Sequence, residues 1–231
     1  MEPADTTKDI AHFILTGDHS RVNDAIDISQ SFSAMKKIVL IVPAKRATDF
    51  KTLRTTNRKI SDILEVQTDD IAQTALDIYE IIMKEKKIGM TVIINISDSS
   101  VQPFTIAACI LGSIIRCKVI SSSLNKDPLE IPTVPYSLLL TTRYEILKAL
   151  GKNGVPDVAT LIKNLADINP DYKNVSKCNI SPNLKRLENR GFITRKDTGK
   201  TKNIMRTKLG LLFQKAYEDS TEQKSMKSKK F

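Results

Sequence analysis

Hydrophobic residues in the first 120 positions follow two alternating patterns. Short aliphatic runs predict buried strands over residues 10–15, 38–42, 63–67, 91–96 and 118–120. Between these runs, apolar residues recur at intervals of three and four. This spacing predicts helices over residues 22–35, 47–62, 71 to near 89, and 103–116. Strands that alternate with helices in this way predict an α/β fold with a doubly wound parallel sheet and right-handed crossovers.

One predicted helix, over residues 103–116, has almost no polar side. Its apolar members are Phe104, Ile106, Ala107, Ala108, Ile110, Leu111, Ile114 and Ile115. A helix that is apolar on nearly all sides is buried in a core or lies in an interface. We expect a homodimer contact here, and a core helix is the alternative.

The pattern changes near residue 140. Prolines at 128, 132 and 135 indicate a linker, and residues 136–140 are predicted as a last strand of the first domain. Helices are then predicted over residues 143–152, with Thr142 as the cap, and over 156–165 and 175–190. A strand that begins at Phe192, a turn at residues 197–200, a strand over 204–207 and a helix over 209–217 follow. Three helices followed by a hairpin predict a winged helix-turn-helix.

Charge divides at the same place. The chain of 231 residues has a formal net charge of +10, but residues 1–135 carry −1 and residues 136–231 carry +11. A neutral part joined to a strongly basic part suggests a sensing module and a nucleic-acid-binding module. We therefore expect a ligand-sensing and dimerisation domain over residues 1–140, a DNA-binding domain over 141–219 and a basic, disordered tail over 220–231.

Several other classes of protein are disfavoured by the sequence. No apolar run approaches the roughly 20 residues that a bilayer requires, and the acidic start of the chain does not resemble a secretory signal. Cys109, Cys117 and Cys178 have no spacing typical of disulfide or zinc scaffolds. Neither GxGxxG nor GxxxxGK[ST] occurs, which disfavours dinucleotide enzymes and P-loop NTPases. We expect a cytoplasmic protein with no metal, no membrane partner and no enzymatic activity.

Two polar loops follow the first and fourth predicted strands. Ligands of doubly wound sheets bind beyond the carboxyl ends of the strands. Hydroxyls, amides and backbone N–H groups at a helix start suit a phosphate or ribose, although the same residues are common turn formers and N-caps. The candidate ligand-binding residues are Thr16, Gly17, Asp18, His19, Ser20 and Arg21 in the first loop, and Asn95, Ser97, Asp98, Ser99, Ser100 and Gln102 in the second.

The basic part contains the candidate DNA-binding residues. The amino-terminal half of the helix over residues 175–190 offers side chains that can meet base edges in the major groove, namely Lys177, Asn179, Ser181 and Asn183. Cations farther along this helix and in the hairpin are expected to meet phosphates, namely Lys185, Arg186, Arg190, Arg195, Lys196, Lys200 and Lys202. A solvated basic surface is the alternative interpretation.

Two stretches carry a resemblance to known DNA-binding proteins. Residues 181–195, read as SPNLKRLENRGFITR, look like the recognition helix and first wing strand of bacterial and archaeal winged-helix repressors. Residues 205–210, read as MRTKLG, resemble the segment that follows the wing. The resemblance covers about residues 142–217 and implies binding to double-stranded DNA.

The combination of this domain with an α/β domain resembles the archaeal CRISPR-associated Rossmann-fold (CARF) regulators. In that family the loop after the fourth strand commonly has an Asn or Asp, a small hydroxyl residue, two glycines, a Thr or Ser and a lysine. Here Asn95, Ser97 and Ser100 match, whereas Asp98 and Ser99 replace the glycines and Val101 replaces the lysine.

The resemblance implies a homodimeric transcription regulator of CRISPR-associated genes that senses a nucleotide such as cyclic oligoadenylate. Loss of the lysine removes one phosphate partner, so a ligand other than cyclic oligoadenylate is an alternative. Two other functions also stay open: cleavage of a cyclic oligonucleotide, and DNA binding by a protein whose first domain only dimerises.

Overall fold

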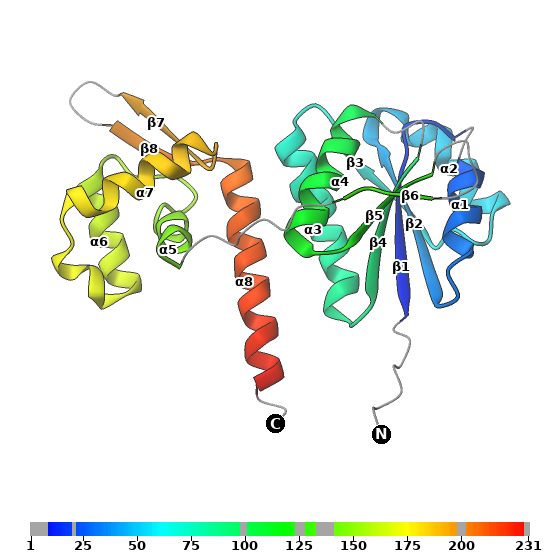
Figure 1. Cartoon of the computed structure of the whole chain (residues 1–231). Coiled ribbons are helices and arrows are strands. Elements are labelled where there is room, and N and C mark those ends of the chain that lie inside the picture. Colours follow the sequence, from blue (N-terminus) through cyan, green and yellow to red (C-terminus); the bar gives the residue numbers. More distant parts are fainter. Residues whose placement is uncertain are drawn as a thin grey trace. The chain divides into compact units, whose positions relative to one another are not determined.

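The computed structural model describes residues 9–19, 22–97, 101–122, 128–132, 141–197 and 202–228; the side chains at 141, 142, 197, 202 and 222–228 are not described. The chain divides into two compact units, Met1–Tyr136 and Ser137–Phe231. Each unit has its own secondary structure (Figure 1) and is considered by itself below.

The first unit contains a six-stranded sheet in the order β3-β2-β1-β4-β5-β6. Its strands are β1 (Ile10–Leu15), β2 (Met35–Pro43), β3 (Asp62–Val66), β4 (Thr91–Ser97), β5 (Lys118–Ser122) and β6 (Leu129–Glu130). β1 to β5 pair in parallel, and β6 pairs antiparallel with β5. The predicted α/β class and parallel sheet are confirmed. β6, a two-residue edge strand, was not predicted, because three prolines led to the interpretation of this stretch as a linker. The strand predicted over residues 136–140 falls outside the described residues.

Helices cover both faces of this sheet. α1 (Val22–Gln30) and α2 (Ala47–Thr56) lie on one face, and α3 (Ile71–Lys87) and α4 (Gln102–Ile115) lie on the other (Figure 1). Two helices end earlier than predicted. α1 stops at Gln30 because Ser31 and Phe32 form a turn onto the preceding carbonyls. α2 stops at Thr56, and Ile60, which extended the apolar spacing, is instead buried in the connection to β3.

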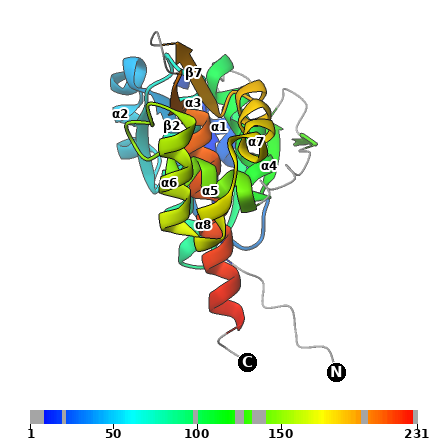
Figure 2. The same ribbon diagram turned by 90° about the vertical axis from the view of Figure 1, so that its left-hand side faces the viewer.

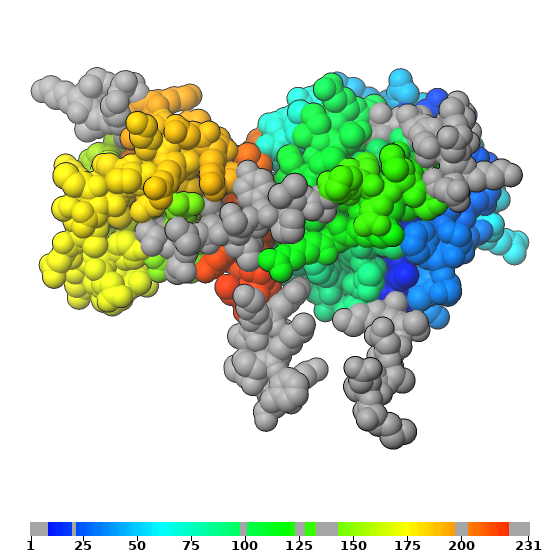
Figure 3. Space-filling model, in the orientation of Figure 1, coloured from blue at the N-terminus to red at the C-terminus, as the bar shows by residue number. Residues whose placement is uncertain are grey.

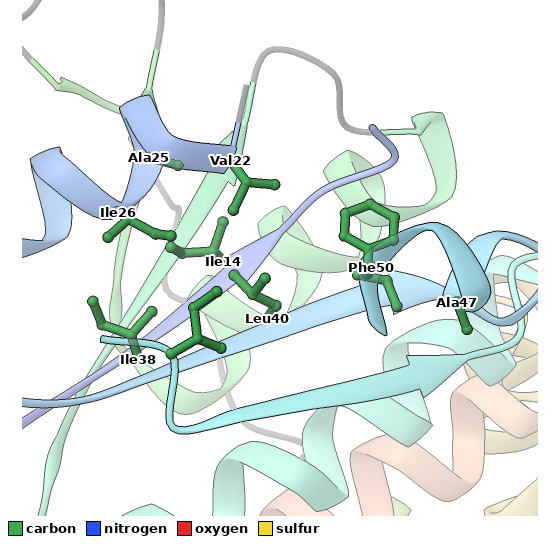
Figure 4. Close-up of a cluster of buried hydrophobic side chains, with 10 residues drawn as sticks. Ile14, Val22, Ala25, Ile26, Ile38, Leu40, Ala47 and Phe50 are labelled. Atoms are coloured by element: carbon green, nitrogen blue, oxygen red, sulfur yellow. The ribbon is translucent and has the colours of Figure 1, made fainter. Parts of the chain in front are cut away.

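The core between the sheet and its first pair of helices is aliphatic. Figure 4 shows Ile14 of β1 and Leu40 of β2 beneath Val22 and Ile26 of α1, with Phe50 of α2 beside them. All five side chains are at most 1% exposed. Because successive strand residues alternate between faces, the same strands also present Phe13 and Leu15 to the other pair of helices.

α4 is neither wholly buried nor wholly exposed. Phe104, Ala107, Ala108 and Leu111 are completely buried against the sheet and α3. The opposite side of the helix, which includes Ile106, Ile110 and Ile114, remains partly exposed in the single chain. Leu111 therefore belongs to the core, and only the outer isoleucines are available to a partner.

The second unit consists of helices (Figure 2) and a two-stranded antiparallel sheet (Figure 1). Its elements are α5 (Thr141–Ala149), α6 (Val158–Ile168), the 3-10 helix η3 (Pro170–Asn174), α7 (Lys177–Asn189), β7 (Ile193–Asp197), β8 (Lys202–Arg206) and α8 (Lys208–Ser228). Val155, between α5 and α6, also bridges to β8, because its N–H donates to Ile204 O at 2.9 Å and the return bond is 2.8 Å. Gly154 permits this approach, since a Cβ there would lie 2.5 Å from Ile204 O.

Three expectations for this unit are corrected. Thr142 lies within α5 instead of capping it, and α6 begins at Val158 because Asp157 accepts the N–H of Thr160 at 2.7 Å. The predicted disordered tail is wrong for residues 220–228, which continue α8 to Ser228. Residues 218–228 contain neither Gly nor Pro, so nothing in the sequence stops the helix there.

Candidate functional sites

The two predicted ligand loops leave the sheet side by side. β1 and β4 are neighbours in parallel, with Leu15 paired to Ile96, so Thr16 and Ser97 emerge at the same edge. The chain order of the sheet reverses between these strands, because β2 and β3 continue on one side and β5 on the other. Such a reversal point is where doubly wound sheets bind ligands. The sheet thus brings together Thr16, Gly17, Asp18 and His19 with Ser97 and with Gln102, the first residue of α4.

The first loop is held in one conformation by its own polar groups. Thr16 is buried, and its hydroxyl donates to Asp18 O at 2.8 Å. The Gly17 carbonyl accepts a hydrogen bond from Arg46 Nη1 at 2.8 Å. His19 is 61% exposed, lies 3.6 Å from the Asp18 carboxylate and meets the ring of Phe50 edge-on. Of these residues, Asp18 and His19 present side chains to solvent at the sheet edge.

In the second loop, Asn95 is turned away from the predicted site. Its side chain is completely buried beneath α1, and its amide donates to Ala25 O at 3.3 Å. Ser29, itself on α1, donates to the same carbonyl at 2.8 Å, so of these two side chains only Asn95 links the carbonyl to the sheet. Ser97 is 2% exposed, at the end of β4. Asn95 therefore positions a helix in this structure.

A buried histidine belongs to the same polar layer. His12 on β1 is completely buried, packs against Phe32 with the two rings tilted at 54°, and has Nδ1 2.9 Å from Ser29 Oγ. Because Ser29 gives its single hydroxyl hydrogen to Ala25, it accepts from an Nδ1–H of His12. His12 Nε2 then carries a lone pair, and it has no hydrogen-bond partner among the described residues. Burial lowers the pKa of His12 to about 4, so the imidazole is neutral at physiological pH.

Five of the predicted ligand residues, Ser20, Arg21, Asp98, Ser99 and Ser100, lie outside the described residues. The structure also adds a residue that the sequence interpretation missed. Arg46 ends the 3-10 helix η2 (Ala44–Arg46) after β2, and its exposed guanidinium reaches Gly17 at the sheet edge. The available signal was the basic pair Lys45-Arg46 immediately after the second strand. Lys45 is taken by Asp69 at 2.7 Å, whereas Arg46 uses one donor on Gly17.

In the second unit, α7 lies at the surface (Figure 3, gold). Its apolar residues Ile180, Leu184 and Leu187 are at most 1% exposed and pack inward. Asn183 is half-buried, and the other candidates on or just after the helix are exposed, namely Lys177, Asn179, Ser181, Lys185, Arg186 and Arg190.

These candidates form two stripes. Asn179, Asn183, Arg186 and Arg190 follow spacings of four, three and four residues, which places them on one side of the helix. Lys177, Ser181 and Lys185 form a second row at spacings of four. The Ser181 hydroxyl already donates to Lys177 O at 2.8 Å. Base-reading and phosphate-binding candidates therefore share the first stripe, contrary to a simple division between the two halves of the helix.

The hairpin residues differ in availability. Arg195 donates through Nε to Glu188 of α7 at 2.9 Å and forms an ion pair with it. This hydrogen bond raises the pKa of Arg195 and ties β7 to the carboxyl-terminal end of α7. Lys196 is exposed. Lys200 and the side chain of Lys202 lie outside the described part of the chain.

Arg143, in the first turn of α5, is a further cation that the sequence interpretation did not single out. α5 packs against α7, and Arg143 Nε is buried with no hydrogen-bond partner among the described residues. Burial chiefly, together with the positive charges of Arg190 and Arg186, lowers the pKa of Arg143. A positive side chain at a helix start is unfavourable for the helix dipole, which was the available sequence signal.

The described residues contain no group of three or more His, Cys, Asp or Glu side chains arranged to hold a metal. Cys109, Cys117 and Cys178 are all free thiols, and burial raises the pKa of Cys117 to about 12. Within the described ranges, no helix combines the length and the apolar character needed to cross a membrane.

Comparison with known proteins identifies one informative relative. No protein-family profile matches the chain. The chain is 30% identical over 156 residues to an uncharacterized protein of Archaeoglobus fulgidus, and the aligned region spans 66% of this chain and 71% of the relative. That identity over that coverage indicates common descent, and the chain belongs to the same family as this archaeal protein.

Proposed function

We propose that the protein is a ligand-responsive, DNA-binding transcription regulator. Residues 141–219 would form its winged helix-turn-helix, and residues 1–140 a CARF-type sensor that dimerises. The succession of α5, the Val155 bridge, α6, α7 and the β7–β8 hairpin supports this proposal, because a winged helix has three helices and a small three-stranded sheet in that order. The +11 charge of residues 136–231 supports nucleic acid as its partner.

α7 would be the recognition helix. Its exposed stripe of two asparagines followed by two arginines combines groups that read adenine with groups that bind phosphate or guanine. Lys196 on the hairpin and Lys185 on the second row would add phosphate contacts. Arg195, held by Glu188, would instead keep the hairpin at a fixed angle to the helix.

The effector site would lie at the carboxyl ends of β1 and β4, where the two loops leave the sheet. α4 begins at the same edge, but its start contributes few donors, because Pro103 has no N–H and the N–H groups of Phe104 and Thr105 donate to Val101 O. Arg46 would supply a cation at this edge, where Val101 replaces the lysine of related proteins. A nucleotide such as a cyclic oligoadenylate, with a phosphate for Arg46, fits this edge.

A homodimer would place two recognition helices on one duplex. The outer isoleucines of α4 favour this face as the contact, because three half-exposed apolar side chains lie one turn apart. Sedimentation of an Ile110→Asp variant tests the contact, since this side chain is outside the core. A monomer is expected, and an unchanged dimer would place the interface elsewhere.

The observation that carries the proposal is the exposed polar and basic side of α7. Fluorescence anisotropy with a labelled duplex from the region upstream of the gene measures binding as salt is raised. A Lys185→Ala/Arg186→Ala variant is expected to bind about 100-fold more weakly at low salt, with a salt slope smaller by about 2. A Lys152→Ala/Lys163→Ala variant, which loses the same charge elsewhere in the unit, is the matched control. Equal weakening in both variants, or no binding by the wild type, would contradict the proposal.

A second function is favoured by one observation, the use of Asn95 to hold α1. If the second loop serves the fold, the first unit only dimerises and the protein binds DNA without an effector. Thermal unfolding with cyclic tetra-adenylate and cyclic hexa-adenylate separates the two functions: a stabilisation lost in an Arg46→Ala variant supports the sensor, and no stabilisation supports the second function.

A further inference from the structure

Three arginines of the second unit gather at the contact between α5 and α7. Arg186 lies in the last turn of α7 and Arg190 directly follows the helix, and both are exposed. Arg143, in the first turn of α5, is the third: α5 packs against α7, and after burial the charges of Arg190 and Arg186 lower the pKa of Arg143. None of the three forms an ion pair with an acidic side chain of the described residues.

This arrangement is unfavourable without an anion. Each arginine repels the other two, and the positive end of the α5 dipole adds to the potential at Arg143. The lowered pKa of Arg143 reflects its burial together with this repulsion. Its Nε–H is moreover buried without an acceptor among the described residues, and such a donor costs more than a solvated one.

An oxyanion among the three guanidinium groups would relieve both costs. A guanidinium presents several N–H donors in a plane, a geometry that matches the oxygens of a phosphate. The cluster lies at the end of the Asn179–Arg190 stripe, the side of α7 that we propose faces DNA. A phosphodiester reached by the same side of the helix fits the cluster better than a free ion.

We infer that Arg143, Arg186 and Arg190 form a clamp for one backbone phosphate of the bound duplex, with Arg143 as a DNA-binding residue contributed by α5. This inference rests on the proposed function. Because phosphate contacts position a protein without reading sequence, the clamp would fix the register of α7 in the groove and leave base choice to Asn179 and Asn183.

The experiment measures anisotropy of the full-length protein with its upstream duplex and with a random duplex across a salt series. Arg143→Ala is expected to weaken binding about tenfold on both duplexes and to lower the salt slope by about 1. Arg143→Lys, which keeps the charge but not the planar fork, should restore the slope and only part of the affinity. Lys152→Ala, in the turn that follows α5, is the matched control and should bind nearly as the wild type does.

The outcomes separate the clamp from the function on which it rests. Wild-type binding with an unchanged Arg143→Ala variant overturns the clamp and leaves the DNA-binding proposal intact, whereas no wild-type binding overturns both. Thermal unfolding of each variant shows whether it is folded, and the double variant Arg186→Ala/Arg190→Ala tests the clamp from α7. Stabilisation by inorganic phosphate that depends on Arg143, without any effect on DNA affinity, would assign the cluster to a free anion and overturn the inference.

Discussion

The two units of this protein differ in whether the polar side chains considered above are buried or exposed. In the sheet unit, His12, Ser29 and Asn95 are buried and bond to one another or to the backbone of α1. In the helical unit, the equivalent candidates on α7 are exposed, and the core beneath them is purely apolar. The comparison teaches that a polar residue on a predicted element identifies a contact surface only when its direction is known. Asn95 and Asn179 look alike in sequence, yet one supports a helix and the other faces solvent.

The largest expected effect tests whether each unit depends on its own core. Leu184→Ala removes a completely buried side chain from α7 and should destabilise the second unit by about 4 kcal/mol. Leu15→Ala is the matched change in the sheet. Hydrogen exchange resolved by region should show faster exchange only in the unit that carries the substitution. If either substitution accelerated hydrogen exchange equally in both units, the two cores would not be independent.

Acid should weaken the sheet unit through His12. The unfolded chain takes up a proton on this imidazole near pH 6.5, whereas the folded unit takes it up only near pH 4. Lowering the pH therefore favours the unfolded state, by about 2 kcal/mol between pH 7 and 5 and about 3 kcal/mol in all. Urea unfolding at several pH values measures this loss. A His12→Leu variant should lack it and a His19→Asn variant should keep it; a loss that persists without His12 would assign the effect to other groups.

A pair of asparagines sharpens the comparison between buried and exposed polar groups. Asn95→Ala removes the amide that holds Ala25 O and should cost the sheet unit about 1.5 kcal/mol, with DNA affinity unchanged. Asn183→Ala should change stability by less than about 0.5 kcal/mol but lower affinity for the upstream duplex about tenfold. Chemical denaturation and anisotropy on both variants give the two readouts. A loss of DNA affinity in Asn95→Ala with a loss of stability in Asn183→Ala would contradict the roles given to the two residues.

The smallest effect is expected at an exposed ion pair. Lys45 and Asp69 join the ends of β2 and β3 at 2.7 Å, but their side chains are 72% and 67% exposed. Lys45→Ala should therefore change the free energy of unfolding by less than about 0.5 kcal/mol. A larger loss in urea unfolding would show that this edge of the sheet is more rigid than its exposure indicates.

Much of the fold was accessible from the sequence because burial leaves a periodic trace. Ile10–Leu15 was predicted with its observed bounds, and the helix over residues 103–116 was one residue from its observed range. Element ends were less accessible. α1 and α2 were predicted too long because Phe32, which is partly buried, and Ile60, which is buried, lie in connections, where they continue a helical spacing without a helix. α8 was predicted too short because residues 218–228 are mostly polar and give no apolar stripe.

The sequence by itself determined the order of the strands and helices, the division of charge between the two parts, and the loops that end β1 and β4. Only the tertiary structure decided that Asn95 points beneath α1, that Arg195 is held by Glu188, and that Arg143 meets Arg186 and Arg190. Periodicity and charge are properties of neighbouring residues along the chain. The direction of a side chain and its partners depend on which distant segments pack against it, and those contacts exist only once the chain has folded.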